Sequence, residues 1–478
     1  MGPGDSDRPC LYICVSMVAW ACHAAAVMRV AVINLVGLSR SLLGRHLPGL
    51  TAFADKHGLQ SHVPEFPALT CPAQASMLTG SNPAKHGIVA NGWYDREAAE
   101  VRFWKQSNHL VRGTKIWDTL RGDIPGFTCA QLFWWYNMYS TADFTVTPRP
   151  LYPADGRKVF DIHTQPMLLR DDLKQALGPF PFPAFWGPAA GIASSEWIAA
   201  SARWIETRHS PTLSFVYLPH LDYPLQKYGP DAAQIPAELA KIDRVASELI
   251  GYYESRNVRV LVVSEYGISP VSRPLHLNRL FRQHGWLQLK NELGRETLDC
   301  GGSRAFAVAD HQIAHVYVND PAIRPAVRWL LDNTPGIAEV RCPADTWGAG
   351  PATERAGDFI AVAAPDTWFT YYFWDDERLA PDYARTIDIH RKPGYDPCEL
   401  ILDPQLTLPK LKIARFLLKK KLGLRGLLEV IPLDATLVRG SHGRDQVPEA
   451  ERPVVLGSAR PVTTTSDVYH AILDAVRS

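Results

Sequence analysis

The chain has 478 residues, of which 46% are hydrophobic and 21% are charged. A globular protein of this size and composition buries a large core, so it needs neither disulfides nor structural metals to be stable. Basic and acidic residues nearly balance, with a formal net charge of +1, which argues against a nucleic acid polymer as partner, because such proteins usually carry a strong basic excess. Eight cysteines without C-x-x-C spacing favour reduced, buried thiols.

Residues 1–28 allow more than one interpretation. An apolar run at 11–27 ends in Ala24-Ala25-Ala26, which is similar to a signal-peptidase site. The segment before it lacks the positive charge of a secretion signal, and the run is short for a membrane span of about 20 residues. We therefore favour a mis-assigned start, with Met28 as the true one, and expect a cytoplasmic protein. Export, with 11–27 as a signal peptide, is the alternative.

The first predicted elements are a strand at 30–36 and a short helix that begins near Thr70. Pro72 suits the first turn of this helix, and Gly80 suits its end. A hydroxyl at Thr70 meets the free N–H groups and the positive end of the helix, where a phosphate also binds well. Taken alone, a threonine at such a position is more often a cap than a nucleophile.

Further along the chain, continuous apolar runs alternate with helical patterns. Continuous runs are typical of parallel strands covered by helices on both faces, and the alternation favours a doubly wound, mostly parallel α/β sheet. Two aromatic- and proline-rich segments, 122–188 and 347–432, break the alternation, and we predict that they are insertions forming a cap above the sheet. The predicted strands are 213–218, 258–263, 314–318 and 338–341, and the predicted helices are 194–206, 235–253 and 321–333.

The second of these segments ends in a basic, leucine-rich stretch at 409–430. A solvated helix face is the default interpretation of such a stretch, and contact with a membrane surface is the alternative. We expect no stable membrane partner.

The residues around Thr70 resemble the nucleophile block of the type I phosphodiesterase/nucleotide pyrophosphatase family, part of the alkaline-phosphatase superfamily with phosphonoacetate-hydrolase-like relatives. The resemblance implies an alkaline-phosphatase-like domain over 29–478, with Thr70 attacking phosphorus and Asn91 donating to a phosphate oxygen. The matching block comprises Phe66-Pro67-Ala68-Leu69-Thr70-Cys71-Pro72, Leu78-Thr79-Gly80-Ser81-Asn82-Pro83, His86-Gly87-Ile88, Asn91 and Tyr94-Asp95.

The same resemblance implies two divalent cations, although the ligand positions are altered. Val36 and Tyr266 stand where the family has an aspartate and a histidine, so the second metal site is impaired; Asn34 compensates only if the strand end is rearranged. Oxygen-rich donors suit Mg²⁺, Mn²⁺ or Ca²⁺ better than Zn²⁺, and one or two ions remain open. Of the other ligand positions, Asp222 and His442 are retained, and Gln226 and Glu265 stand where the family has a histidine and an aspartate.

Weaker candidates for substrate contact complete the predicted site. Arg149 and Arg444 carry guanidinium groups that suit a phosphate. His311 and His315, if they lie on one strand, face the same side and form a substitute ligand set, although ordinary packing is the default. Tyr266 belongs to this weaker group as well.

These features together predict a metal-dependent hydrolase of phosphodiester or pyrophosphate bonds in a small, nucleotide-like phosphorylated substrate, acting through a phosphothreonine intermediate. Two alternatives stay open. One is a catalytically silent relative that binds a phosphorylated ligand, which Val36 and Tyr266 favour. The other is a phosphonate or phosphomonoester hydrolase with one metal. The sequence leaves the oligomeric state open.

Overall fold

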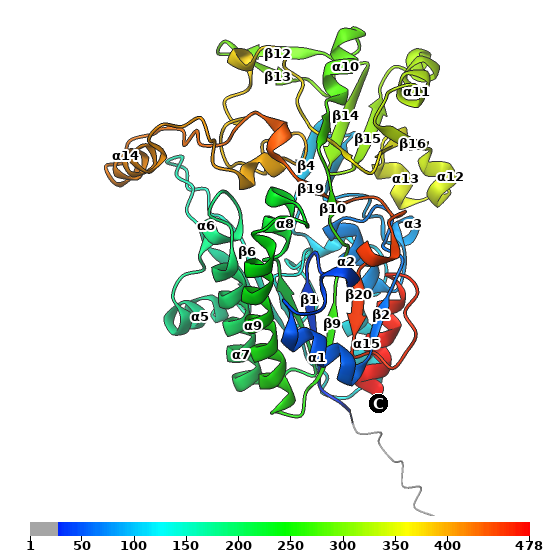
Figure 1. Cartoon of the computed structure of the whole chain (residues 1–478), viewed down its shortest axis with the longest axis vertical. Helices are drawn as coiled ribbons and strands as arrows, with labels where there is room; N and C mark the ends of the chain where they lie inside the picture. Colours follow the sequence, from blue (N-terminus) through cyan, green and yellow to red (C-terminus); the bar gives the residue numbers. More distant parts are fainter. Residues whose placement is uncertain (1–26) are drawn as a thin grey trace, which may run out of the picture.

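The computed structural model describes residues 27–478, so the alternatives for the N-terminal run fall on residues outside the described part. Figure 1 shows a lower body built around one large sheet and an upper body built around a smaller one. Within residues 27–478, no helix is both long and apolar enough to cross a bilayer.

The large sheet has eight strands in the order β2-β20-β9-β1-β8-β5-β6-β7. Strands β9, β1, β8, β5 and β6 run parallel, and the pairings of β20 with β9, β2 with β20, and β7 with β6 are antiparallel. The predicted mostly parallel α/β sheet is therefore confirmed. Its strands are β1 (Val30–Leu35), β2 (Leu59–Ser61), β5 (Cys129–Leu132), β6 (Phe144–Pro148), β7 (Ile162–Gln165), β8 (Leu213–Leu218), β9 (Arg259–Val263) and β20 (Val454–Leu456).

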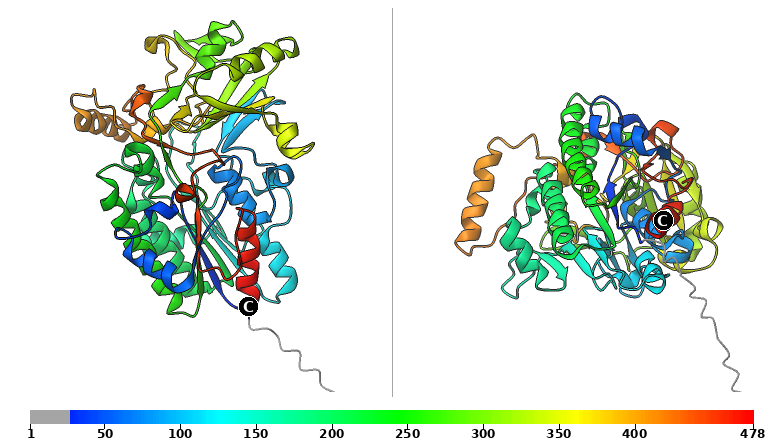
Figure 2. Two further views of the ribbon diagram at one scale, coloured as in Figure 1. Left: turned by 45° about the vertical axis from the view of Figure 1, so that its right-hand side comes forward. Right: turned by 90° about the horizontal axis from the view of Figure 1, so that it is seen from below.

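Helices cover both faces of this sheet (Figure 2). On one face α7 packs on β8 and β5, and α9 packs on β9; on the other, α15 packs on β1 and contacts α2 and α4. Amphipathic stripes such as Ile235, Leu239 and Ile242 of α9 are buried against their neighbours. The lower helices are α1 (Pro48–His57), α2 (Thr70–Thr79), α3 (Pro83–His86), α4 (Ile116–Asp123), α5 (Leu169–Leu177), α6 (Phe182–Phe185), α7 (Ile192–His209), α8 (Asp222–Tyr228), α9 (Ile235–Glu254) and α15 (Asp467–Arg477).

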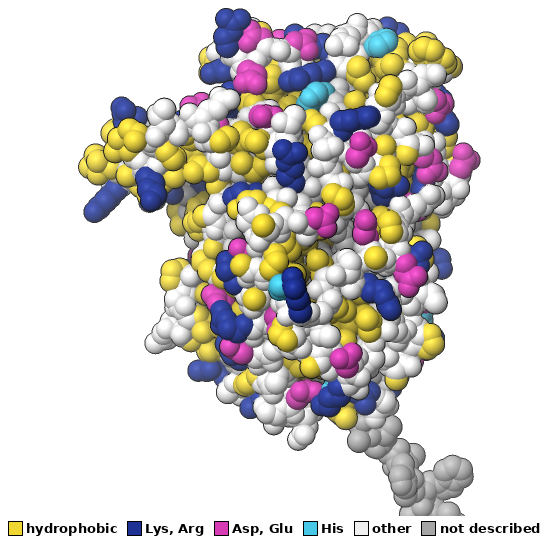
Figure 3. All heavy atoms as spheres, in the orientation of Figure 1, with side chains coloured by type: hydrophobic (Ala, Val, Ile, Leu, Met, Phe, Trp, Pro, Cys, Tyr) yellow, Lys and Arg dark blue, Asp and Glu magenta, His cyan; other side chains and the backbone are white. Residues whose placement is uncertain are grey.

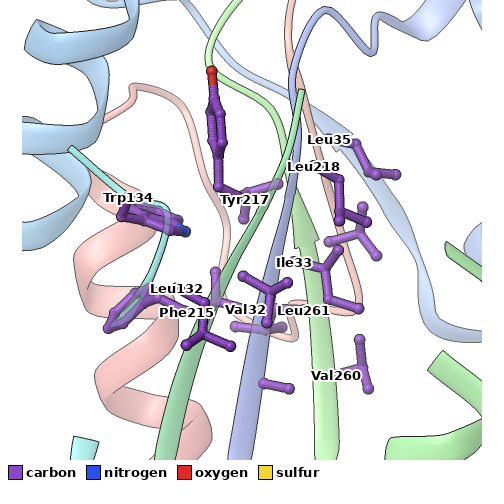
Figure 4. Packing of buried hydrophobic residues seen from close by; sticks show 14 of the residues in the cluster. Val32, Ile33, Leu35, Leu132, Trp134, Phe215, Tyr217, Leu218, Val260 and Leu261 are labelled. Atoms are coloured by element: carbon purple, nitrogen blue, oxygen red, sulfur yellow. The ribbon is translucent and has the colours of Figure 1, made fainter. Parts of the chain in front are cut away.

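The core of the lower body lies between neighbouring strands and these helices. Val32, Phe215 and Leu261 come from β1, β8 and β9, and none of the three is exposed to solvent. Figure 4 shows their side chains packed beside those of the adjoining strands. Because both faces of the sheet are covered, the central strands β1, β8 and β9 are largely apolar, which is why the sequence predicted these three.

Two predicted strands belong to a different sheet from the one expected. The segments 314–318 and 338–341 form β15 and β16, which lie in a four-stranded antiparallel sheet of order β14-β15-β17-β16 in the upper body. An apolar run indicates a buried strand but does not reveal its partner or direction. The four strands are β14 (Ala305–Asp310), β15 (Ile313–Val318), β16 (Ile337–Arg341) and β17 (Phe359–Ala363).

The prediction that 122–188 caps the sheet is wrong. This segment supplies β5, β6 and β7 to the large sheet, and its aromatic residues Phe133, Phe180 and Phe185 belong to or pack against the lower core. Because these strands are short and separated by irregular turns, the apolar residues of this segment show no regular spacing in the sequence. The segment 347–432 does lie in the upper body, but that body begins earlier, after the neck strand β10 (Ser269–Pro270), and ends at its antiparallel partner β19 (Gly440–Ser441).

The upper body also contains shorter elements around its sheet, and the hairpin of β3 and β4 contacts it through β14. These elements are β3 (Gly92–Asp95), β4 (Glu100–Phe103), β11 (Arg273–Leu275), α10 (Leu277–Gln283), β12 (Leu289–Glu292), β13 (Arg295–Leu298), α11 (Arg324–Asp332), α12 (Pro343–Trp347), α13 (Pro351–Arg355), β18 (Thr367–Phe369) and α14 (Pro409–Lys421).

Candidate active site

Thr70 begins α2, as the sequence predicted. Leu69 before it is extended, and Gly80 ends the helix in the left-handed conformation with φ of +62°. The Thr70 side chain is buried, and its Oγ1 lies 2.9 Å from the hydroxyl oxygen of Tyr266. The start of α2 therefore presents a hydroxyl to the residues that follow the strands of the large sheet.

A chain of hydrogen bonds runs outward from this hydroxyl. Tyr266 Oη donates to Asp222 Oδ1 at 3.4 Å, which leaves the Thr70 hydroxyl to donate to Tyr266. Gln226 Nε2 donates to Asp222 Oδ2 at 2.8 Å, and Tyr395 Oη donates to Gln226 Oε1 at 2.9 Å. Burial raises the pKa of the Asp222 carboxyl to about 7, partly offset by the bonds from Gln226 and Tyr266. The network therefore links the Thr70 proton to a carboxylate that titrates near neutrality.

His442 lies beside Asp222 because the returning strand β19 passes close to α8. A Cβ at Gly440 would lie only 2.1 Å from the carbonyl oxygen of Leu225 in α8, so this approach requires glycine. The Nδ1 of His442 is 2.8 Å from the carbonyl oxygen of Ala68, which makes that nitrogen the donor and leaves a lone pair on Nε2. Nε2 is buried, has no hydrogen-bond partner in the described structure, and lies 4.0 Å from Asp222 Oδ1.

Glu265 occupies a separate, fully buried position next to Thr70. Its Oε1 accepts hydrogen bonds from Asn34 Nδ2 and Gln74 Nε2, each 2.6 Å long. Asn34 reaches it from within β1 through Nδ2, while its Oδ1 is buried and has no hydrogen-bond partner in the described structure. Burial raises the pKa of Glu265 to about 8, partly offset by the bonds from Gln74 and Asn34. The Glu265 side chain is thus held as a neutral group among amides near pH 7.

Asn91 anchors the start of α2 to the upper body. Its Oδ1 accepts from the Cys71 backbone N–H at 3.0 Å, and its Nδ2 donates to Asp310 Oδ1 at 3.1 Å. A further bond, 2.8 Å long, joins the Asn91 N–H to Asp310 Oδ2. One amide N–H of Asn91 remains for another acceptor, as the predicted contact with a phosphate oxygen requires.

His311 and His315 do not lie on one strand face, so they do not form the substitute ligand set that was the alternative to ordinary packing. β14 ends at Asp310 and β15 begins at Ile313, so His311 lies in the connecting turn with φ of +61°. Its ring stacks on Tyr395 and lies 3.8 Å from the ring of His442, centroid to centroid. Both ring nitrogens of His315 instead bond to backbone groups, the Val89 carbonyl and the Gly357 N–H. His311 therefore borders the site, and His315 is structural.

The two candidate arginines form no hydrogen bond with the Thr70 cluster and line cavities of their own. Arg149 lines a cavity of about 550 Å³ together with residues of β4, the β12–β13 hairpin and His390. Arg444 follows His442 in sequence but lines a smaller cavity with Glu339 and Asp445. Neither is in the network described above.

Sequence reasoning missed Gln74 and Tyr395 and left Asp310 without a role of its own. Gln74 had a usable signal, because it follows Thr70 by four residues and so shares its helix face. Tyr395 had none, since it lies in an irregular part of 347–432. Packing of the upper body on the lower one brings it to the site.

The donor set suits one divalent cation better than two. Between Asp222 and His442, the bare Nε2 lone pair faces a carboxylate, and the Ala68 carbonyl fixes the imidazole tautomer as the outer partners of metal ligands do. At Glu265, Oε1 accepts from two amides and Oε2 is buried without a partner in the described structure, but no imidazole or second carboxylate bonds there. Among residues 27–478, no three or more His, Cys, Asp or Glu side chains form a metal-binding group.

Relatives in sequence and in structure agree on the family and the fold. An uncharacterized pyrophosphatase/phosphodiesterase of Schizosaccharomyces pombe is 25% identical over 295 residues, which cover 59% of this chain and 53% of that protein. Ectonucleotide pyrophosphatase/phosphodiesterase 2 of Saccharomyces cerevisiae is 24% identical over 225 residues, covering 44% and 39%. The chain thus spans about half the length, or less, of these curated relatives.

Solved structures resemble the fold over nearly the whole chain. Murine ectonucleotide pyrophosphatase/phosphodiesterase 5 in complex with AMP matches with a TM-score of 0.54 at 14% identity, covering 94% of this chain and 95% of that one. Phosphonoacetate hydrolase from Sinorhizobium meliloti with phosphonoacetate matches with a TM-score of 0.58 at 15% identity, covering 94% and 96%. The predicted alkaline-phosphatase-like fold is confirmed. The family model for type I phosphodiesterase/nucleotide pyrophosphatase matches residues 30–396, and the chain therefore belongs to that family.

Proposed function

We propose that the protein hydrolyses phosphodiester or pyrophosphate bonds in a small, nucleotide-like substrate, with Thr70 as the nucleophile. The observation that carries this proposal is the continuous link from Thr70 Oγ1 through Tyr266 Oη to Asp222. Membership of the family supports it. So does the murine relative, whose AMP complex was made with an inactive threonine-to-alanine variant.

In the proposed reaction, the Thr70 hydroxyl gives up its proton along this link while its oxygen attacks phosphorus. A threonine hydroxyl is a weak nucleophile, and removal of its proton by a positioned group is what activates it. The new Oγ1–P bond forms as the bond from phosphorus to the leaving oxygen breaks, and that oxygen takes the electron pair. Water then cleaves the phosphorylated threonine and releases the product.

The surrounding residues hold the reacting groups in place. Asn91 has a free amide N–H at the start of α2, where a phosphate oxygen would meet it and the positive end of the helix. Tyr266 stacks on His442 with ring centroids 3.6 Å apart, which fixes the direction of its hydroxyl. A divalent cation held by Asp222 and His442 would neutralise phosphoryl oxygens, and Asp222 would then be a ligand of the cation in place of accepting the Thr70 proton.

The test is hydrolysis of bis(p-nitrophenyl) phosphate by the wild type and by Thr70→Ala and Thr70→Ser. We expect Thr70→Ala to lose activity by about a thousandfold or more, and Thr70→Ser to keep a measurable part, because it retains the hydroxyl. Hydrolysis that survives in Thr70→Ala rejects the nucleophile assignment. If p-nitrophenyl phosphate or a phosphonate were hydrolysed faster than the diester, the substrate would instead be a phosphomonoester or a phosphonate.

A silent phosphate-binding protein is the second candidate. It is favoured by Glu265, which is held by two amides where the resemblance implied a cation ligand. This candidate predicts no turnover of any aryl phosphate, together with calorimetric binding of AMP that Thr70→Ala leaves unchanged.

A further inference from the structure

Helix α14 projects from the upper body and contacts the lower body through Lys420. Figures 1 and 2 show it at the end of an arm that extends sideways from the upper body. None of its residues is fully buried. Ile413 is partly buried and packs against an upper-body core. Most of the helix surface is therefore exposed to solvent.

Exposed leucines are concentrated on this arm. Seven of the nineteen large hydrophobic side chains that are exposed within residues 27–478 lie between positions 408 and 427. So dense an apolar patch is uncommon on a soluble surface and marks an interaction site. The seven are Leu408, Leu411, Leu417, Leu418, Leu422, Leu424 and Leu427.

The same stretch is strongly basic. It contains seven lysines and arginines, and no acidic residue occurs from Pro404 to Leu428. Lys420 and Arg425 donate to backbone carbonyl oxygens of Lys158 and Asp155, not to carboxylates. The seven basic residues are Lys410, Lys412, Arg415, Lys419, Lys420, Lys421 and Arg425.

Helical spacing sorts these residues into a stripe with a basic border. Leu411, Leu418 and Leu422 are separated by seven and four residues, so they lie on one face, and they are 63%, 58% and 66% exposed. At about 100° per residue, Lys421 borders this face on one side and Arg415 on the other. Figure 3 shows hydrophobic and basic side chains together on the projecting arm.

We propose that α14 docks on an anionic lipid bilayer. The helix lies in the plane of the interface, with Leu411, Leu418 and Leu422 at the acyl-chain boundary and the flanking cations on lipid phosphates. A second copy of the chain is a poorer occupant, because pairing two such arms brings their basic residues together. The sequence alone favoured a solvated face with membrane contact as the alternative; the proposal adopts that alternative, because the helix projects from the body with its leucine stripe exposed.

The lower body contacts α14 from the side opposite the leucine stripe. Phe160 packs beneath the Lys420 ammonium, 5.6 Å from its ring centroid, and Lys420 is nine residues from Leu411, about 180° around the helix. This contact therefore leaves the stripe of Leu411, Leu418 and Leu422 exposed to solvent.

The experiment measures sedimentation of the whole protein with vesicles of phosphatidylcholine, alone or with phosphatidylglycerol as roughly a third of the lipid. We expect binding to the anionic vesicles to be at least about tenfold tighter, and to weaken as salt rises. Replacing Leu411, Leu418 and Leu422 together by serine should weaken it by about tenfold or more, because the charge stays and the apolar stripe is lost. Replacing Lys410, Arg415 and Lys421 by glutamine should have a similar effect.

Matched variants separate this surface from general stickiness. Leu293→Ser removes a fully exposed leucine at the tip of the β12–β13 hairpin, and Lys56→Gln with Lys85→Gln removes exposed charge elsewhere; both should bind like the wild type. Circular dichroism checks that the serine variant is folded. Equal binding to neutral and anionic vesicles, no binding to either, or a lipid-free dimer that needs the three leucines would overturn the proposal.

Discussion

At position 266 the tyrosine hydroxyl touches both the proposed nucleophile and the carboxylate behind it. Tyr266→Phe keeps the ring on His442 and removes only this hydroxyl. We expect kcat on an aryl phosphodiester to fall by about a hundredfold with KM little changed, because the proton route is lost while substrate contacts remain. Tyr253→Phe, at a buried tyrosine within α9, is the matched control and should leave kcat unchanged. An unaltered kcat in Tyr266→Phe would remove Tyr266 from the mechanism.

Glu265 gives the protein a pH-dependent stability that one substitution should remove. Burial raises the pKa of Glu265 in the folded protein from 4.5 to about 8, so folding favours the neutral form of this side chain. Glu265 contributes fully to the free energy of unfolding below pH 4.5. This contribution is lost as the pH rises toward 8, by about 1.4 kcal/mol per pH unit. In Glu265→Gln the side chain is neutral throughout and still accepts from Asn34 and Gln74.

The expected result is that Glu265→Gln gains stability relative to the wild type between about pH 5.5 and 8, as measured by urea unfolding. The other buried carboxyls are present in both proteins, so the difference reports Glu265 together with its repulsion from Asp222. If the variant were instead less stable than the wild type by the same amount at every pH in this range, Glu265 would be ionised in the folded protein throughout that range.

Individual site residues were predictable where the chain places them at the end of a regular element. Thr70 precedes a helix, and Asp222 and Glu265 follow buried strands, so their shared location came from the sequence. Tyr395 and Asp310 reach the site only through the packing of the upper body. His311 and His315 do not share a strand face, because the turn between β14 and β15 breaks the alternation; His315 fits the default interpretation of ordinary packing.

On the scale of single elements, α2 is held in place by its C-terminal cap. Gly80 has φ of +62°, and a Cβ there would lie 2.8 Å from the Tyr469 ring of α15. Gly80→Ala therefore adds a clash to the strain of a left-handed alanine, which by itself costs about 1 kcal/mol. Gly126 has φ of +74° and open space around it, so Gly126→Ala introduces the left-handed backbone strain without a clash.

We expect Gly80→Ala to lower the free energy of unfolding by about 1–3 kcal/mol more than Gly126→Ala does, as measured by urea denaturation. Equal losses in the two variants would mean that Tyr469 moves aside freely. The packing of α15 on α2 would then not be what positions Thr70.

For the molecule as a whole, a buried ion cluster joins the upper body to the lower one. Lys392 Nζ lies 2.7 Å from both Asp396 Oδ2 and Glu399 Oε1, and all three side chains are buried. Glu399 also accepts from the indole N–H of Trp186, which follows α6 in the lower body. Tyr395, within this segment, is thereby held against Gln226 and His311.

Lys392→Met should destabilise the protein by about 3–5 kcal/mol, because it leaves two buried carboxylates without a cation. Lys241→Met breaks an exposed pair with Glu238 and should cost less than about 1 kcal/mol. Urea unfolding of both variants makes the comparison. A small, equal cost would show that the cluster does not couple the two bodies.

The lower body could be predicted from the sequence far better than the upper one. Its parallel strands are continuous apolar runs with helices between them, and this pattern has few alternatives. The upper sheet is antiparallel and uses equally apolar strands such as β15, whose partners the pattern does not specify. Residues 122–188 were assigned to the cap because β5, β6 and β7 are short and separated by aromatic turns.

The central claim is that Thr70 becomes covalently attached to phosphorus, and acid quenching during turnover of bis(p-nitrophenyl) phosphate tests it most directly. Mass spectrometry of the peptide containing Thr70 should show a nitrophenyl phosphoryl group, left after one nitrophenolate departs, and Thr70→Ser should carry it at the same position. An unmodified peptide during steady release of nitrophenolate, or an adduct on a different residue, would contradict the account.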